Sequence, residues 1–149
     1  MECAEPEDAF PPAGVLRFSI AGLARSCGIS RTQVRRILKA AADAAGVAFF
    51  STVGFPEEVA LLQEIGCDSI KIASADVNHF PLIRVAARTG MCIQIDTGSS
   101  SLAEIERAVD VILAEGNDRI IIHQCPSGYP ARVESIHLRM IQTLRTMFP

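Results

Sequence analysis

Short apolar runs recur along this chain at a nearly regular interval, and they restrict its fold more than any other feature. Each run is four or five residues long and mostly apolar, which is typical of a strand buried on both faces of a parallel sheet. The runs begin roughly 20–30 residues apart, the spacing expected of βα units. They cover residues 47–50, 69–73, 91–95 and 119–122. The sequence therefore predicts an α/β fold with parallel strands.

Residues that begin and end helices fill the gaps between these runs. Prolines stand where helices would start and glycines where they would stop; these are Pro56, Gly66, Pro81, Gly90 and Gly116. Ser101 and Glu104 form a capping box at the start of a third helix. A last helix is predicted over residues 133–147, where apolar residues recur at helical spacing.

The composition excludes several classes of protein. Hydrophobic residues make up 49% of the chain and the net charge is only −3, which excludes intrinsic disorder. No apolar run approaches the ~20 residues of a membrane span, and the acidic start of the chain does not resemble a signal peptide. The five cysteines are scattered, with no CxxC pair, so neither a disulfide framework nor a zinc site is indicated. We expect a cytoplasmic protein without membrane contacts.

Charge and turn residues divide the chain into three parts. Residues 9–42 contain six basic residues and no acidic one, and a Pro-Pro-Ala-Gly stretch precedes the first helical pattern. We predict a flexible arm over residues 1–14, a helical segment over 15–45 and the α/β part over 46–149.

Polar side chains follow each apolar run, where a strand would end. In a parallel sheet these ends share one edge, where binding sites gather. Each residue could instead simply cap the next helix. The pairs are Ser51 and Thr52, Ser74 and Asp76, Asp96 and Thr97, and His123 and Gln124.

Lys71 lies within the second run, where a plain core would place valine or isoleucine. A buried lysine needs an anionic partner or loses its charge. The phosphate or carboxylate of a ligand could be that partner, and so could Asp96 on the neighbouring strand.

The residues at these strand ends resemble those of the N-acetylneuraminate (sialic acid) synthase family, including its pseudaminic and legionaminic acid synthases. The resemblance covers about residues 39–149 and rests on four motifs in order. These are Phe49-Phe50-Ser51-Thr52, Lys71-Ile72-Ala73-Ser74-Ala75-Asp76, Thr97-Gly98 and Cys125-Pro126-Ser127-Gly128-Tyr129-Pro130.

The resemblance implies a TIM barrel that condenses phosphoenolpyruvate with an N-acetylated hexosamine such as N-acetylmannosamine. It implies a divalent metal, manganese or magnesium. By resemblance, Lys71 and Asp76 are catalytic. The positions that would bind phosphoenolpyruvate are Thr52, Lys71, Ser74 and Ser127. Tyr129 would contact the sugar, and Asp76 would lie beside the sugar.

The chain also departs from the family pattern. An eight-stranded barrel needs ~250 residues, and only four βα units are predicted here. The strands that carry the family's metal-binding histidines are missing, so we expect no metal ligands in this chain. We expect a truncated or inactive version of the enzyme, with the open sheet edges favouring a homo-oligomer.

Residues 18–39 support a different hypothesis. Ser19 and Ser30 are placed to cap two helices with Gly28 in the turn between them, a pattern that resembles the helix-turn-helix of transcription regulators. The second helix would then present Arg31, Gln33, Arg35 and Arg36 to DNA, and the α/β part would sense a small molecule. Alternatively, the second helix is an ordinary barrel helix with a solvated basic face.

Overall fold

The computed structural model describes residues 19–128 and 131–149. The chain divides into two compact units, of which the first ends at Ile37 and the second is Leu38–Pro149. The arm predicted over residues 1–14 and the predicted site residue Tyr129 lie outside the described residues, and the domain boundaries given above stay predictions. In the described part of the chain, no helix is long and apolar enough to cross a membrane.

Two helices with side-chain caps begin the described chain, and both start where the sequence predicts. They are α1 (Ile20–Cys27) and α2 (Arg31–Ala44). The Ser19 hydroxyl accepts a backbone N–H of the first turn of α1, and Gly28 ends that helix in the left-handed conformation with φ 65°. Ser30 and Gln33 cap α2 reciprocally, because each side chain accepts the backbone N–H of the other residue.

Four parallel strands form one sheet in chain order, as predicted. Each pairs with the next along the chain, so every connection is a crossover that contains a helix. The strands are β1 (Phe50–Val53), β2 (Ser69–Ile72), β3 (Cys92–Asp96) and β4 (Ile120–His123).

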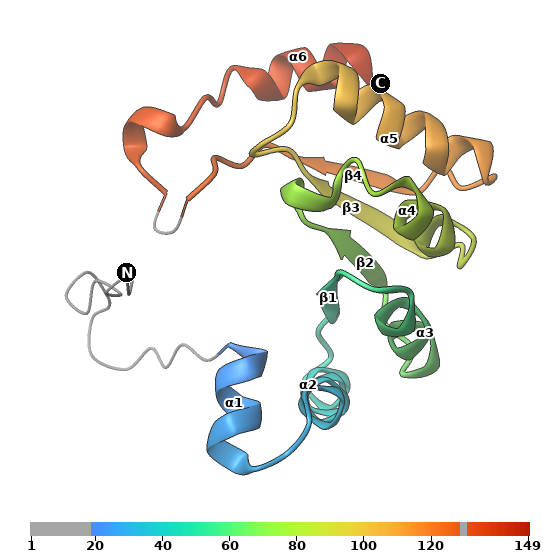
Figure 1. Ribbon diagram of the computed structural model, residues 1–149, viewed down its shortest axis with the longest axis vertical. Helices are drawn as coiled ribbons and strands as arrows, with labels where there is room; N and C mark the ends of the chain where they lie inside the picture. Colours follow the sequence, from blue (N-terminus) through green and yellow to red (C-terminus); the bar gives the residue numbers. More distant parts are fainter. Residues whose placement is uncertain (1–18, 129–130) are drawn as a thin grey trace. The chain divides into compact units, whose positions relative to one another are not determined.

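One face of this sheet, the helix face, packs against the helices that follow the first three strands. They are α3 (Pro56–Glu64), α4 (Phe80–Ala87) and α5 (Leu102–Ala114), and they lie along the same side of the sheet (Figure 1). Alternate strand residues point toward them, since successive side chains of a strand face opposite ways. The fully buried strand residues of this core are Val53, Ile70, Ile72, Ile93 and Ile95.

The opposite face, the open face, is mostly polar and partly exposed to solvent. Its residues are Phe50, Thr52, Ser69, Lys71, Cys92, Gln94, Asp96, Ile121 and His123. Phe50 and Ile121 are 47% and 48% exposed, so the prediction that both faces of every strand are buried is wrong. Every second residue of each strand lies on this polar face. The strands are so short and so rich in apolar residues that the sequence did not reveal this alternation.

Two predicted boundaries also differ from the structure. The first strand begins at Phe50 rather than Val47, because pairing with β2 begins opposite Ser69, and Val47 is 58% exposed. The last helix, α6, covers only Met140–Met147. A short 3-10 turn, Val133–Ser135, precedes it, and Ile136 is in extended conformation with ψ 110°, so the predicted helix over 133–147 is interrupted.

Asn117 fixes the end of the sheet opposite to the predicted site. Its side-chain amide donates to the carbonyl oxygens of Ala87 (3.0 Å) and Met91 (2.8 Å). Its side-chain oxygen accepts the N–H of Arg119 at 2.9 Å. The residue is 5% exposed, and these bonds join the end of α4 to the starts of β3 and β4.

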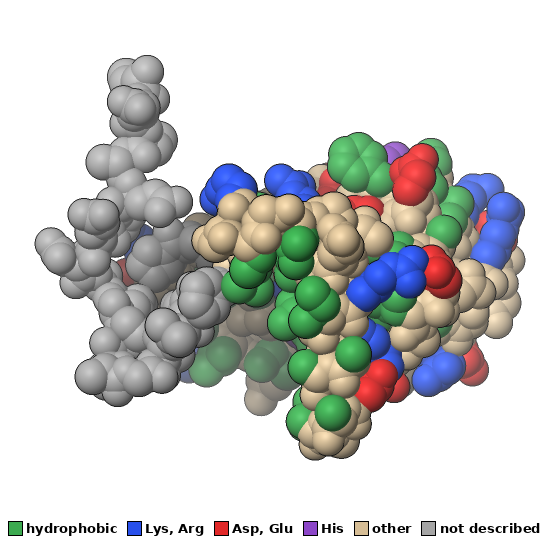
Figure 2. Space-filling model, turned by 90° about the horizontal axis from the view of Figure 1, so that it is seen from below, with side chains coloured by type: hydrophobic (Ala, Val, Ile, Leu, Met, Phe, Trp, Pro, Cys, Tyr) green, Lys and Arg blue, Asp and Glu red, His purple; other side chains and the backbone are tan. Residues whose placement is uncertain are grey.

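Hydrophobic side chains also lie at the surface (Figure 2). Several large ones are at least half exposed, including Phe55 at 67% and Leu138 at 65%.

Candidate functional site

An ion pair joins β2 and β3 on the open face, toward the carboxyl ends of the strands. Lys71 Nζ is 2.6 Å from Asp96 Oδ2, with side-chain exposures of 25% and 11%. Asp96 therefore provides the anionic partner that a half-buried lysine needs. The sequence left open whether Lys71 pairs with a ligand or with Asp96, and the structure shows the pair with Asp96. Lys71 remains partly accessible to solvent.

A chain of hydrogen bonds runs beside this pair across three strands. The Gln94 amide donates to Ser69 Oγ at 2.6 Å, and Gln94 Oε1 lies 3.1 Å from His123 Nε2. With the amide in this orientation, His123 Nε2 carries the proton that is donated to Gln94. The bonds hold the His123 ring against the sheet, one strand away from the Lys71–Asp96 pair.

The loops after β3 and β4 meet at the carboxyl ends of the strands. Ser99 Oγ lies 2.6 Å from Ser127 Oγ, and the Thr97 hydroxyl donates to the His123 carbonyl at 2.8 Å. Gly98 makes this approach possible, since a Cβ there would lie 2.9 Å from the Cys125 carbonyl oxygen. Any side chain at position 98 would therefore push the two loops apart.

A cavity of about 490 Å³ lies at the edge of the open face, between the Lys71–Asp96 pair and the loops that follow β3 and β4. Of the residues predicted to bind substrate, Lys71, Ser74 and Ser127 line it. It combines one cationic side chain with several hydroxyl groups, a donor set suited to a ligand that carries phosphate or carboxylate. The other lining residues include Asp96, Ser99, His123, Gln124 and Cys125.

Two further predicted residues are described but are not among those that line this cavity. Thr52 lies opposite Lys71 in the register of β1 and β2, on the same open face. Asp76 ends the short 3-10 helix Ser74–Asp76 that follows β2, and it is partly buried. Their roles toward a substrate stay predictions.

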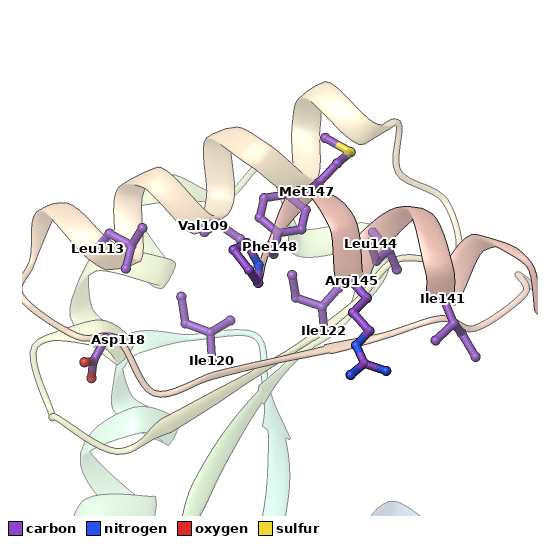
Figure 3. A pocket seen from close by; sticks show the side chains of 11 residues that line it. Val109, Leu113, Asp118, Ile120, Ile122, Ile141, Leu144, Arg145, Met147 and Phe148 are labelled. Carbon is purple, nitrogen blue, oxygen red and sulfur yellow. The ribbon is translucent and has the colours of Figure 1, made fainter.

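A different cavity, of about 540 Å³, lies on the helix side, between α5, β4 and α6. Figure 3 shows its mostly apolar lining, with side chains such as Leu113, Ile120 and Ile141 around the hollow. Asp118 and Arg145 are its charged residues. It lacks the convergent hydroxyl groups of the cavity at Lys71, so we place the candidate chemistry at Lys71.

The predicted metal was tested against the side chains present. Among residues 19–128 and 131–149, no three side chains of His, Cys, Asp or Glu come close enough together to hold a metal ion. The described donor set does not fit the implied divalent ion.

The side chains predicted to read DNA do not all project from α2. Arg31 and Arg36 are exposed. Arg35 is only 8% exposed, so its predicted outward position is wrong, and the Gln33 side chain is engaged in the cap of its own helix.

Comparison with known families decides the assignment. The model of the NeuB family matches residues 16–149 of the chain. The chain belongs to the NeuB family. The match includes both α1 and α2, so these helices are part of the family's sequence, and the comparisons give no support to the DNA-binding alternative.

Characterised relatives of this NeuB chain carry synthase names. The N,N'-diacetyllegionaminic acid synthase of Campylobacter jejuni is 34% identical over 104 residues, which is 68% of this chain and 31% of that protein. Human N-acetylneuraminate-9-phosphate synthase is 30% identical over 115 residues, 76% of this chain and 32% of that protein. The chain thus spans about a third of the length of these relatives.

Solved structures agree with the predicted fold. The sialic acid synthetase of Leptospira borgpetersenii, in complex with citrate, superposes with a TM-score of 0.75 at 29% identity, over 82% of this chain and 42% of that one. A DAHP synthase of Thermotoga maritima gives a TM-score of 0.67 at 17% identity, a likeness of fold alone. The prediction of a partial TIM barrel from the sialic acid synthase family is confirmed.

The sequence alone did not single out Ser69, Gln94 or Ser99. Ser69 and Gln94 alternate with isoleucines, and they share a face with Lys71 and Asp96. Counting every second residue of β2 and β3 would have found Ser69 and Gln94, whereas Ser99 lies in the loop after β3.

Proposed function

We propose that this NeuB family chain provides the phosphoenolpyruvate-binding part of a sialic acid synthase-type enzyme. That enzyme would condense phosphoenolpyruvate with an N-acetylated hexosamine to form a nine-carbon acidic sugar. Since the chain spans about a third of its relatives' length, the complete reaction would need the remaining strands of the barrel as well.

The proposed reaction balances with water as the third reactant. A carbon–carbon bond forms between the methylene carbon of phosphoenolpyruvate and the aldehyde carbon of the open sugar, whose oxygen takes a proton. Water adds to the former enol carbon, and inorganic phosphate leaves as the keto acid forms. No electrons are gained or lost overall, so no redox cofactor is required.

The observation that carries the proposal is the shared cavity of Lys71, Ser74 and Ser127. The ammonium group of Lys71 would bind an anionic oxygen of the substrate, and the serine hydroxyls would donate to others. All of these bonds to an anionic oxygen are charge-assisted. Lys71 also brings a positive charge, which a serine does not, so removing Lys71 should weaken binding more than removing either serine.

The remaining roles belong to the same proposal. Thr52 would extend the phosphoenolpyruvate site across β1, and Asp76 and Tyr129 would contact the sugar. The divalent ion that the resemblance implies, manganese or magnesium, would need ligands other than the described residues of this chain. A second copy of the chain is a possible partner through the open sheet edges, and the cytoplasm is the expected location.

Titration calorimetry with phosphoenolpyruvate tests the proposal. The intact chain should bind it, and Lys71→Ala should reduce the affinity at least about tenfold. Lys39→Ala is the matched control because Lys39 is the only other lysine. Equal binding by the intact chain and Lys71→Ala, or no binding by either, would overturn the assignment of this site.

A further inference from the structure

We propose that Asp96 is a specificity-determining residue that competes with the substrate for Lys71. This inference rests on the proposed function, because it concerns the same phosphoenolpyruvate site. The free protein already holds Lys71, the one lysine or arginine among the described residues that line the cavity, in an ion pair of 2.6 Å. An anionic substrate must share Lys71 with Asp96 or displace it.

The geometry makes the competition unavoidable. Lys71 and Asp96 both line the cavity, and the carboxylate comes from the neighbouring strand, in a row with His123. Both side chains are mostly buried, so water screens them less than a surface pair. An anionic oxygen that touches Lys71 Nζ therefore lies within a few ångströms of the Asp96 carboxylate.

Two opposing effects follow from the position of Asp96. In the free protein the carboxylate holds Lys71 in place and offsets the cost of burying its charge. In the complex the same carboxylate repels the substrate, with an energy that grows with the charge of the ligand. The repulsion should dominate for phosphoenolpyruvate, which carries both phosphate and carboxylate.

The hydroxyl groups of the cavity would bind the ligand without this penalty. The serines at positions 74, 99 and 127 carry no charge and line the same space. They can donate to a phosphate oxygen whether or not Lys71 is shared. The Asp96 carboxylate therefore limits how much affinity the site gains from each additional negative charge of the ligand.

The test compares Asp96→Asn with the intact chain by calorimetry, using phosphoenolpyruvate and pyruvate as probes. The substitution keeps the shape of the side chain and removes its charge. We expect the affinity for phosphoenolpyruvate to rise about tenfold or more, and that for pyruvate to rise less, because pyruvate carries a single charge. Asp110→Asn is the matched control, since Asp110 is exposed on α5 and is not among the residues that line this cavity.

The outcomes separate this inference from the proposed function. If both the intact chain and Asp96→Asn bind phosphoenolpyruvate through Lys71 with equal affinity, or if the variant binds more weakly, Asp96 is not a competitor and the site assignment stands. If neither binds it in a Lys71-dependent manner, both ideas fail. An equal gain for pyruvate and phosphoenolpyruvate would also overturn the inference.

A second variant keeps the test decisive if the first does not fold. Asp96→Ala removes the charge with a smaller side chain, and thermal unfolding of both variants shows which is folded. The double variant Lys71→Ala/Asp96→Asn completes the cycle. If Asp96 acts through Lys71, the effect of Asp96→Asn on affinity should differ with and without Lys71, and equal effects would overturn the inference.

Discussion

The two faces of the sheet differ in what their residues contribute. The helix face is built from isoleucine and valine side chains that are at most 1% exposed, packed under α3, α4 and α5. The residues of the open face alternate with those of the helix face along the same strands. The open face carries an ion pair, a chain of hydrogen bonds and two hydrophobic residues that are about half exposed.

Within the same strands, the side chains of the helix face stabilise the fold, and those of the open face line the candidate binding site. Burial of apolar area by the helices stabilises the sheet mainly through the side chains of the helix face. The open face is therefore free to carry charge and hydroxyl groups where the strands end. Substitutions on the two faces should have separable effects, and the predictions below test that separation.

The largest expected effect is on the helix face. Ile93→Ala removes buried methyl groups from a fully buried site and should lower the free energy of unfolding by about 2–5 kcal/mol. Ile121→Ala, on the open face, removes a side chain that is 48% exposed and should cost less than about 1 kcal/mol. Denaturant unfolding measures both, and similar losses would break the comparison.

Asn117→Ala should come next, with a loss of about 2–3 kcal/mol, because it leaves buried backbone groups without partners. Asn78→Ala is the control, since Asn78 is exposed and donates only to Glu104 among the bonds described. Phosphoenolpyruvate affinity should not change, because Asn117 lies at the far end of the strands. A large loss of affinity would show that the two ends are coupled.

Gly98→Ala should affect both stability and binding. The added Cβ would meet the Cys125 carbonyl oxygen at 2.9 Å, and moving backbone apart costs about 1–3 kcal/mol. The Ser99–Ser127 contact should also open, which would weaken phosphoenolpyruvate binding. Gly54→Ala is the matched control, because its nearest contact would be an ordinary 3.9 Å to Glu58 Oε2. Equal behaviour of the two variants in unfolding and titration would contradict the proposed loop contact.

The smallest expected effect concerns acid sensitivity between α4 and α5. The Arg88 guanidinium hydrogen-bonds Glu115 and lowers the pKa of that carboxyl below its ordinary value of 4.5. A lowered pKa stabilises the fold above the ordinary value, and this contribution is lost as the pH falls through the lowered pKa. Glu115→Gln should therefore lose less stability than the intact chain on acidification.

Urea unfolding at about pH 7 and about pH 3 measures this difference. Glu106→Gln, an exposed glutamate on the same helix, is the control. An intact chain and a Glu115→Gln variant with the same acid sensitivity would show that the Arg88–Glu115 pair does not link the two helices.

Much of the fold was predictable from local signals. The capping box of Ser101 and Glu104 and the caps at Ser19 and Ser30 are short-range features, and all of them form as predicted. The parallel strands follow from the regular spacing of the apolar runs, while their order in the sheet is what the resemblance to a barrel family implies. The interrupted last helix was not predictable from its apolar stripe, because Ile136 adopts an extended conformation that no local residue signal requires.

The candidate site was predictable only in part. Lys71 and its alternative partner Asp96 could be named because a lysine inside an apolar run needs an anion. The hydrogen bond between Gln94 and His123 depends on the register of β3 and β4, which spacing along the chain does not determine. The approach of Gly98 to Cys125 likewise arises from tertiary structure.

Mapping the phosphoenolpyruvate site by amide NMR tests the central claim most directly. Titration into the labelled chain should shift the signals of residues 71–74, 96–100 and 124–128, at the carboxyl ends of the strands, and leave α3 and α4 unchanged. Shifts that gather instead around the apolar cavity between α5, β4 and α6, or no shifts at all, would contradict the assignment of binding to the open face.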